Sequence, residues 1–198
     1  MDTLTLIKNR CSIRRYKKKA ISKKKLKKII EAGVWGPSVP SFLMIQPWKF
    51  VVVLNARIKK KIVNAILRKS RISGTGVNIM LSSASRIIDA APVVILVYNS
   101  NELADLKFKF KEIFLRFAKI IPRAELSAIS AAIQNMILVA EDLGIGSCWL
   151  DIPLFCSKEI NKIINENKKL MAVLTLGYSS EKGKRAHRKP LIEMVRVV

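Results

Sequence analysis

Four short apolar runs constrain the fold of this chain more than any other feature of its sequence. The first, Phe50–Val53, is apolar at every position and shows no alternation with polar residues. Such a strand must be covered on both faces, because a solvent-facing side would place a polar residue at every second position. The later runs are Val93–Tyr98, Ile145–Leu150 and Met171–Tyr178. We therefore predict a sheet that lies between layers of helices.

The longest helical pattern lies between the second and third apolar runs. Arg123–Leu143 repeats apolar residues at the helical period and is apolar on nearly all of its sides. We expect a long buried helix there, ended by Gly144. Ser22 is the expected N-cap of a helix that reaches Gly33.

Shorter helical patterns fill the rest of the chain. Ser157 is the expected N-cap of a helix to about Asn165. Further helices are expected over Leu4–Ile7, Ala56–Ser70 and Leu103–Ile121. No element is assigned to residues 71–85, where Gly74-Thr75-Gly76 is interpreted as a turn. The sequence shows neither an internal repeat nor a linker, so we predict a single domain over residues 1–198.

The net charge of +23 favours attraction to anions of every kind. A basic nucleic-acid-binding module is therefore one alternative. However, the lysines are dispersed along the chain, and aromatic residues are not interleaved with the basic runs as stacking platforms would require. A compositional bias of the source genome would produce the same excess of lysine.

The sequence also predicts where the protein works. No apolar run reaches the roughly 18 residues that a membrane helix needs, and the N-terminus has no secretory signal pattern. The cysteines Cys11, Cys148 and Cys156 form neither a CxxC pair nor a zinc spacing. We expect reduced thiols, no metal site and a cytoplasmic protein that does not bind membranes.

A cluster of guanidinium groups and a hydroxyl lies close to the N-terminus, in Arg10-Cys11-Ser12-Ile13-Arg14-Arg15-Tyr16. Arginine forms planar, bidentate hydrogen bonds with phosphate, and serine adds a small donor beside it. The stretch is therefore either a phosphate-binding loop or solvated basic surface. A Rossmann fingerprint and a P-loop are both missing from the sequence, which argues against those two kinds of nucleotide site.

Five motifs resemble those of the FMN-dependent nitroreductase family, in the same order along the chain. Arg10–Arg14 resembles the Arg-Arg-Ser-x-Arg opening of that family, with Cys11 in place of the second arginine. The other matching segments are Trp35–Ser38 with Gln46–Phe50, Asp89–Pro92, Ala132–Trp149, and Leu176–Tyr178 with Arg188–Leu191. The resemblance covers nearly the whole chain.

The resemblance implies an α+β fold, a three-layer α/β/α sandwich with a central mixed, mostly antiparallel sheet. It also implies an intertwined homodimer with one FMN in each of two interface sites. NADH or NADPH would reduce the flavin, and an acceptor such as a nitroaromatic or a quinone would then enter the same site. Because flavin carries the redox chemistry, no catalytic side chain is required, and the lone His187 is interpreted as part of a solvated tail.

The resemblance further implies which residues hold FMN. The phosphate and ribityl end would be held by Arg10, Ser12 and Arg14, by the backbone of Cys11, and by Arg188 with Lys189 or Arg185 nearby. The other subunit would contribute Pro37, Ser38 and Val39 to the ring. The remaining ring contacts would be Trp149, Leu150 and Asp151, with backbone N–H groups near N5, and Arg86 near the O2 edge.

Two segments of the sequence allow more than one class of substrate. The loop Ser41–Ile45 is longer than in many family members, which keeps same-fold dehalogenation or flavin breakdown as alternatives. The aromatic residues of 103–121 would serve either core or dimer packing, or a substrate lid: Phe108, Phe110, Phe114 and Phe117.

Overall fold

The computed structural model describes residues 2–38, 45–102 and 120–198. Its sheet has four strands in the order β1-β2-β4-β3, and each neighbouring pair is antiparallel. The strands are β1 (Trp48–Val53), β2 (Val93–Asn99), β3 (Gly146–Leu150) and β4 (Leu170–Gly177). The four predicted strands are confirmed, and every residue of the central strand β2 is buried.

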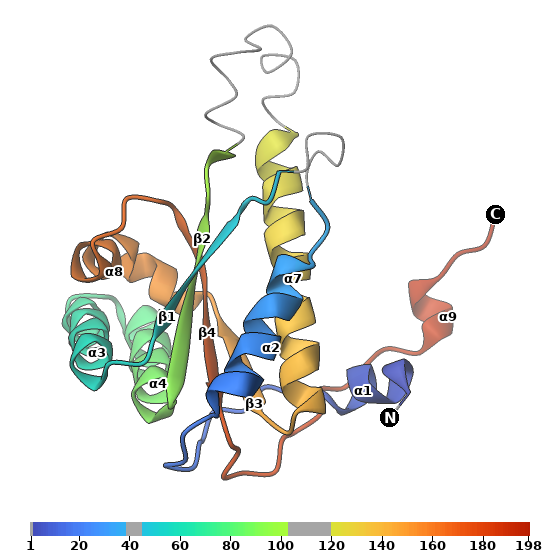
Figure 1. Ribbon diagram of the computed structural model, residues 1–198, viewed down its shortest axis with the longest axis horizontal. Coiled ribbons are helices and arrows are strands. Elements are labelled where there is room, and N and C mark those ends of the chain that lie inside the picture. The colour runs from blue at the N-terminus through green and yellow to red at the C-terminus, as the bar shows by residue number, and fades with distance from the viewer. Residues whose placement is uncertain (1, 39–44, 103–119) are drawn as a thin grey trace, which may run out of the picture.

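Helices cover both faces of this sheet, as Figure 1 shows. One layer packs against one face through apolar residues of α3 (Ala56–Arg71), α4 (Thr75–Ala90) and α8 (Ser157–Ile164). The other layer consists of α2 (Lys23–Val34) and α7 (Ile121–Asp142). The α+β sandwich is therefore confirmed. Three short elements complete the described part of the chain: α1 (Thr3–Asn9), the 3-10 helix η2 (Ile152–Cys156) and α9 (Leu191–Met194).

Local chemistry explains most of the helix ends. The side chain of Ser22 accepts a hydrogen bond from the Lys25 N–H at 3.3 Å, as an N-cap should. After the C-terminal end of α7, Gly144 adopts a φ of +68°, which favours glycine. The prediction for Ser157 is wrong: this residue is the first of α8, and Cys156 holds the cap position without a side-chain hydrogen bond.

Helix α4 corrects the interpretation of residues 71–85. The helix begins at Thr75, within the supposed Gly74-Thr75-Gly76 turn. Its buried residues include Leu81, Ala84 and Ile88, which recur at the helical period. Gly74 supplies no side-chain cap, and the serines and glycine of this segment lower its intrinsic helix propensity. Tertiary burial of the apolar stripe stabilises a helix that propensity does not favour.

Some predicted features lie outside the described residues. They are Val39, nearly all of the loop Ser41–Ile45, and the segment 103–119 with its four phenylalanines. Among the helices of the described ranges, none is both long enough and apolar enough to cross a bilayer.

Candidate functional site

The two ends of the chain run side by side at the edge of the sheet formed by β3. The Ile13 N–H donates to the Ser147 carbonyl at 2.8 Å, and Ser12 and Ser147 form an isolated parallel bridge. Four residues farther along, the N-terminal segment pairs with the segment after β4 through an antiparallel bridge between Tyr16 and Ser179. This pairing places the predicted phosphate-binding loop against the chain that leads to the basic tail.

Tyr16 anchors the N-terminal segment in the core. Its hydroxyl donates to the Ile13 carbonyl at 2.6 Å and shares a 2.8 Å hydrogen bond with Oγ1 of Thr175 on β4. The side chain is buried, and this burial raises the pKa of the Tyr16 hydroxyl above its ordinary value. Gly177 accommodates the ring, since a Cβ there would lie 2.7 Å from Tyr16 Cδ1. The loop is therefore held by a neutral, hydrogen-bonded phenol.

A carboxylate from the tail binds the backbone of the same loop. Oε1 of Glu181 accepts hydrogen bonds from the Arg14 N–H at 2.6 Å and the Arg15 N–H at 3.1 Å. Oε2 of Glu181 lies 4.0 Å from Nε of Arg15. The Ser180 N–H donates to the Arg15 carbonyl at 3.1 Å. Glu181 therefore joins the backbone at Arg14, one of the predicted phosphate-binding arginines, and at Arg15 to the start of the tail.

Two further contacts extend this pairing toward the N-terminus. Gly183 packs so closely on Cys11 that a Cβ at Gly183 would lie 1.9 Å from the Cys11 Sγ. The Arg185 guanidinium donates to Oδ1 of Asn9, at the end of α1. We name the paired segments 9–16 and 179–185 the terminal clasp.

The terminal clasp is strongly basic. Burial raises the pKa of the Cys148 thiol on β3, and the nearby Arg14 and the more weakly acting Arg10 partly oppose this rise. Only three ion pairs occur among the described residues, and one of them, Arg15 with Glu181, belongs to the clasp. Within the part of the chain that the structure describes, Glu181 is thus the only carboxylate that forms an ion pair with a cation of the clasp.

The structure brings some predicted site residues together. Arg10, Cys11, Ser12 and Arg14 lie in the clasp with Arg185. Arg188 lies beyond the clasp in an exposed stretch, and its Nη1 donates to the carbonyls of its own neighbours Ala186 and His187. Lys189 is exposed in the same stretch.

The predicted ring contacts occupy the end of β3. Trp149 and Leu150 are half-buried in the last part of the strand, and Asp151 follows them at the surface. The indole Nε1 of Trp149 donates to Oδ1 of Asp151 at 2.7 Å, which fixes the tryptophan ring across this turn.

The other predicted ring contacts lie on separate elements. Pro37 and Ser38 follow α2, where Gly36 lies against Ala132 of α7. Arg86 is exposed on α4, and its Nε donates to the Ser82 carbonyl of the same helix at 3.3 Å. Pro37, Ser38 and Arg86 thus lie on elements outside the clasp.

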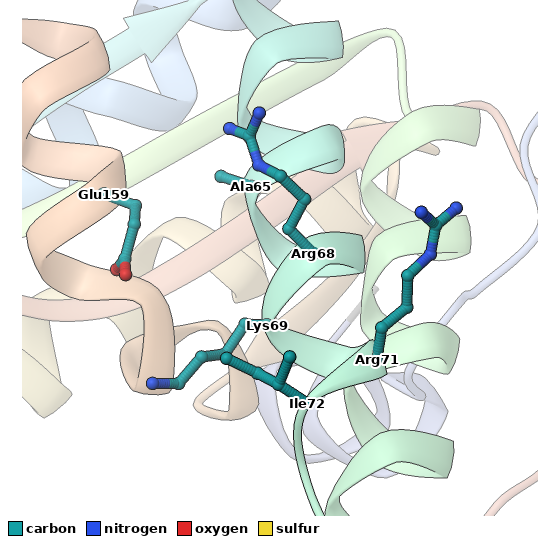
Figure 2. Close-up of a pocket in the computed structure, with 6 residues that line it drawn as sticks. All are labelled: Ala65, Arg68, Lys69, Arg71, Ile72 and Glu159. Atoms are coloured by element: carbon teal, nitrogen blue, oxygen red, sulfur yellow. The ribbon is translucent and has the colours of Figure 1, made fainter.

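A separate basic hollow of about 380 Å³ lies between α3 and α8 (Figure 2). Arg68, Lys69 and Arg71 line it, but Figure 2 shows these three side chains pointing in different directions. Glu159 of α8 places a carboxylate on the same hollow. Cations that diverge beside an acid do not form a phosphate site, so substitutions in this hollow are suitable controls for tests of anion binding.

Sequence reasoning missed Tyr16, Glu181 and Gly183 as parts of the site. The sequence does contain one signal for Glu181. It is the only acid between Tyr178 and Pro190, and five lysines and arginines follow it within that stretch. Among the described residues, no group of three or more His, Cys, Asp and Glu side chains could hold a metal ion.

The chain is similar to known proteins over most of its length. The model of the family described as "Nitroreductase family" matches residues 7–178. A protein of Methanothermobacter thermautotrophicus, assigned as an NADH dehydrogenase/NAD(P)H nitroreductase, is 29% identical over 185 residues, which cover 91% of this chain and 79% of that protein.

Two solved structures share the fold over nearly their full lengths. One, assigned as a nitroreductase and crystallised with FMN, comes from Desulfovibrio desulfuricans; it is 25% identical, covers 98% of this chain and 96% of its own, and has a TM-score of 0.72. The other is a BluB-like flavoprotein from Clostridium difficile 630; it is 25% identical, covers 100% and 99%, and has a TM-score of 0.74.

Proposed function

This chain belongs to the nitroreductase family, and from that premise we propose that it is an FMN-dependent oxidoreductase. It would take hydride from NADH or NADPH and pass it, in a second half-reaction at the same site, to a nitroaromatic, a quinone or a similar small acceptor. The basic terminal clasp, which lies beside the start of β3 at Gly146 and Ser147, is the observation that carries this proposal. The FMN-bound relative from Desulfovibrio desulfuricans supports the choice of cofactor.

The residues of the clasp fit the phosphate end of FMN. Arg10 and Arg14 flank Ser12 in the sequence and would supply guanidiniums beside its hydroxyl; Nη1 of Arg14 donates to the Ser12 carbonyl at 3.4 Å. The carboxylate of Glu181 is already engaged by backbone N–H groups. A phosphate would therefore meet donors rather than a competing free acid. The tail would add Arg188, with Lys189 or Arg185 nearby.

The residues at the end of β3 fit the ring. When bound, FMN would supply the two-electron hydride chemistry, and the protein would supply binding, orientation and electrostatics. The backbone N–H groups of Trp149–Asp151 would face N5, and the Trp149–Asp151 hydrogen bond keeps this turn in one conformation. Arg86 would add positive charge near the O2 edge, where charge develops in the reduced flavin.

We also propose that the protein is a homodimer, whose second subunit supplies Pro37, Ser38 and Val39 to the ring. Several large apolar side chains are uncovered in the protomer: Leu191 is 77% exposed and Ile192 is 87% exposed on α9, and Trp35 is 78% exposed beside the Pro-Ser loop. Figure 1 shows α9 and the C-terminus projecting away from the sandwich. Exposed apolar surface of this kind is typical of protein–protein interfaces.

Truncation tests this assembly. A chain that ends at Pro190 keeps Arg185, Arg188 and Lys189 but loses the apolar segment. We expect it to sediment as a monomer at concentrations where the full chain is a dimer. A truncated chain that remains fully dimeric would assign the interface to other surfaces.

The cofactor is tested by the absorbance spectrum of the purified protein and by flavin titration. We expect a yellow protein that is bleached by NADH or NADPH without oxygen. Arg10→Gln and Arg14→Gln should each weaken FMN binding by about tenfold, the worth of one charge-assisted hydrogen bond. Binding of riboflavin, which has no phosphate, should change little, and Arg68→Gln in the basic hollow is the matched control. A protein that stays colourless after FMN is added would refute the proposal.

The acceptor class is a separate question. Mixing the reduced protein with a nitroaromatic, a quinone, iodotyrosine or oxygen, and comparing the rates at which flavin absorbance returns, would distinguish nitroreduction from dehalogenation or flavin breakdown. The +23 charge keeps a nucleic-acid-binding module as the alternative from another class. Gel shifts with duplex and single-stranded DNA at physiological salt test that alternative. The three free cysteines support a reducing compartment, and we propose the cytoplasm.

A further inference from the structure

Glu181 is an acid with an unusual position in a basic part of the molecule. Its carboxylate accepts two backbone N–H groups from consecutive residues, Arg14 at 2.6 Å and Arg15 at 3.1 Å. Both hydrogen bonds reach the same oxygen, Oε1. Arg14 and Arg15 lie 167 and 166 positions before Glu181 in the sequence, so this carboxylate joins two distant segments of the chain.

The conformation of Glu181 is itself fixed locally. Its backbone N–H donates to Oγ of Ser179 at 3.1 Å, and the same Oγ donates to the Glu181 carbonyl at 2.6 Å. The neighbouring Ser180 N–H donates to the Arg15 carbonyl at 3.1 Å. A backbone held this way loses little additional freedom when the Glu181 side chain binds the loop.

We propose that Glu181 is a positioning residue that pre-organises the phosphate-binding loop and the tail as one unit. By binding the backbone at Arg14 and Arg15, it would fix the direction in which the Arg14 guanidinium leaves the loop. By the same contact, it orients the segment that continues through Gly183 and Arg185 toward Arg188. This inference rests on the proposed flavin function for its consequence, but the contact itself does not depend on a flavin.

An alternative role for the same carboxylate makes the opposite prediction. Two consecutive N–H groups that bind a carboxylate could also bind a phosphate. If Glu181 merely occupied an anion site, its removal would open that site and tighten FMN binding. If Glu181 positions the loop, its removal loosens FMN binding.

Three variants separate these roles. Glu181→Ala removes the acceptor. Glu181→Gln keeps one side-chain oxygen, and that suffices because a single oxygen accepts both N–H groups. Glu159→Ala removes an exposed acid of α8, outside the clasp and the proposed interface, and is the matched control.

The first measurement is limited proteolysis without flavin. Trypsin cleaves after the tail residues Lys182, Lys184 and Arg185, which become more accessible if the clasp opens. We expect Glu181→Ala to raise the initial cleavage rate there by about tenfold, with Glu181→Gln and Glu159→Ala near the wild-type rate. Equal rates in all four proteins would overturn the inference.

The second measurement compares FMN with riboflavin by fluorescence titration of the full chain. We expect Glu181→Ala to weaken FMN binding by about tenfold and riboflavin binding by less than about twofold, with Glu181→Gln restoring FMN affinity. FMN affinity that is unchanged or higher, or an equal loss for both flavins, would overturn the positioning role. If the wild type binds no FMN, the proposed function and the positioning role both fail, and the proteolysis result alone decides whether the contact holds the tail.

Discussion

Replacing Tyr16 by phenylalanine tests whether the N-terminal loop is held by one hydroxyl. The tyrosine is only 8% exposed. Its hydroxyl lies 2.6 Å from the Ile13 carbonyl and 2.8 Å from the Thr175 Oγ1. Phenylalanine keeps the ring against Gly177, so the substitution removes these hydrogen bonds while the packing stays the same.

The magnitude follows from what the substitution leaves behind. The Ile13 carbonyl loses its hydroxyl donor, and Thr175, which is fully buried, loses one partner. Leaving a buried polar group unsatisfied costs roughly 1–3 kcal/mol. Thr175 retains a longer contact of 3.3 Å to the Cys148 carbonyl, which limits its share of the cost. We therefore expect the free energy of unfolding to fall by about 2 kcal/mol.

The assay is urea unfolding at one fixed protein concentration, because a dimer's apparent stability depends on concentration. A double-mutant cycle with Thr175→Val isolates the pair. Removing both hydroxyls leaves fewer stranded partners than the two single changes together, so we expect the double variant to lose about 1 kcal/mol less than their sum.

Two results would contradict this reasoning. A Tyr16→Phe protein within about 0.5 kcal/mol of the wild type would mean that water replaces the lost bonds. Strict additivity with Thr175→Val would mean that the two hydroxyls do not interact. In either case the loop would have to be held by its backbone contacts with Ser147 and Glu181.

Two further predictions address packing and charge. Gly183→Ala should separate the tail from the loop, because its Cβ would lie 1.9 Å from the Cys11 Sγ. We expect weaker FMN binding and a lower melting temperature, and adding Cys11→Ala should partly restore both. If Cys11→Ala restores neither, the strain lies elsewhere. The hydrogen bond from Lys49, the largest cause, lowers the pKa of Glu166 below its ordinary value of 4.5. Its stabilising contribution is therefore present above about pH 4.5 and is lost as the pH falls through the lowered pKa. Thermal melts of Glu166→Gln should show a deficit at pH 7 that closes in acid, and a deficit that is independent of pH would rule out this ion pair as its source.

Hydrophobic patterning alone predicted the layers of the fold. Val93–Tyr98 lies in the wholly buried central strand β2, and the pattern of Arg123–Leu143 corresponds closely to α7. These predictions succeed because a strand buried on both faces, or a helix buried all round, requires apolar residues at positions that are close together in the sequence. The same local reasoning failed for α4, where the packing of Leu81 and Ile88 outweighs a sequence that is poor in helix formers.

The candidate site divides in the same way. The sequence by itself identified arginines and a serine near the N-terminus as a candidate phosphate-binding motif, because those donors are contiguous. Only the tertiary structure decided that Glu181 binds the backbone of that motif and that Gly183 admits the side chain of Cys11. A contact between residues more than 160 positions apart leaves no local periodicity, because it is made by the return of β4 alongside β3, which brings the tail to the N-terminal loop.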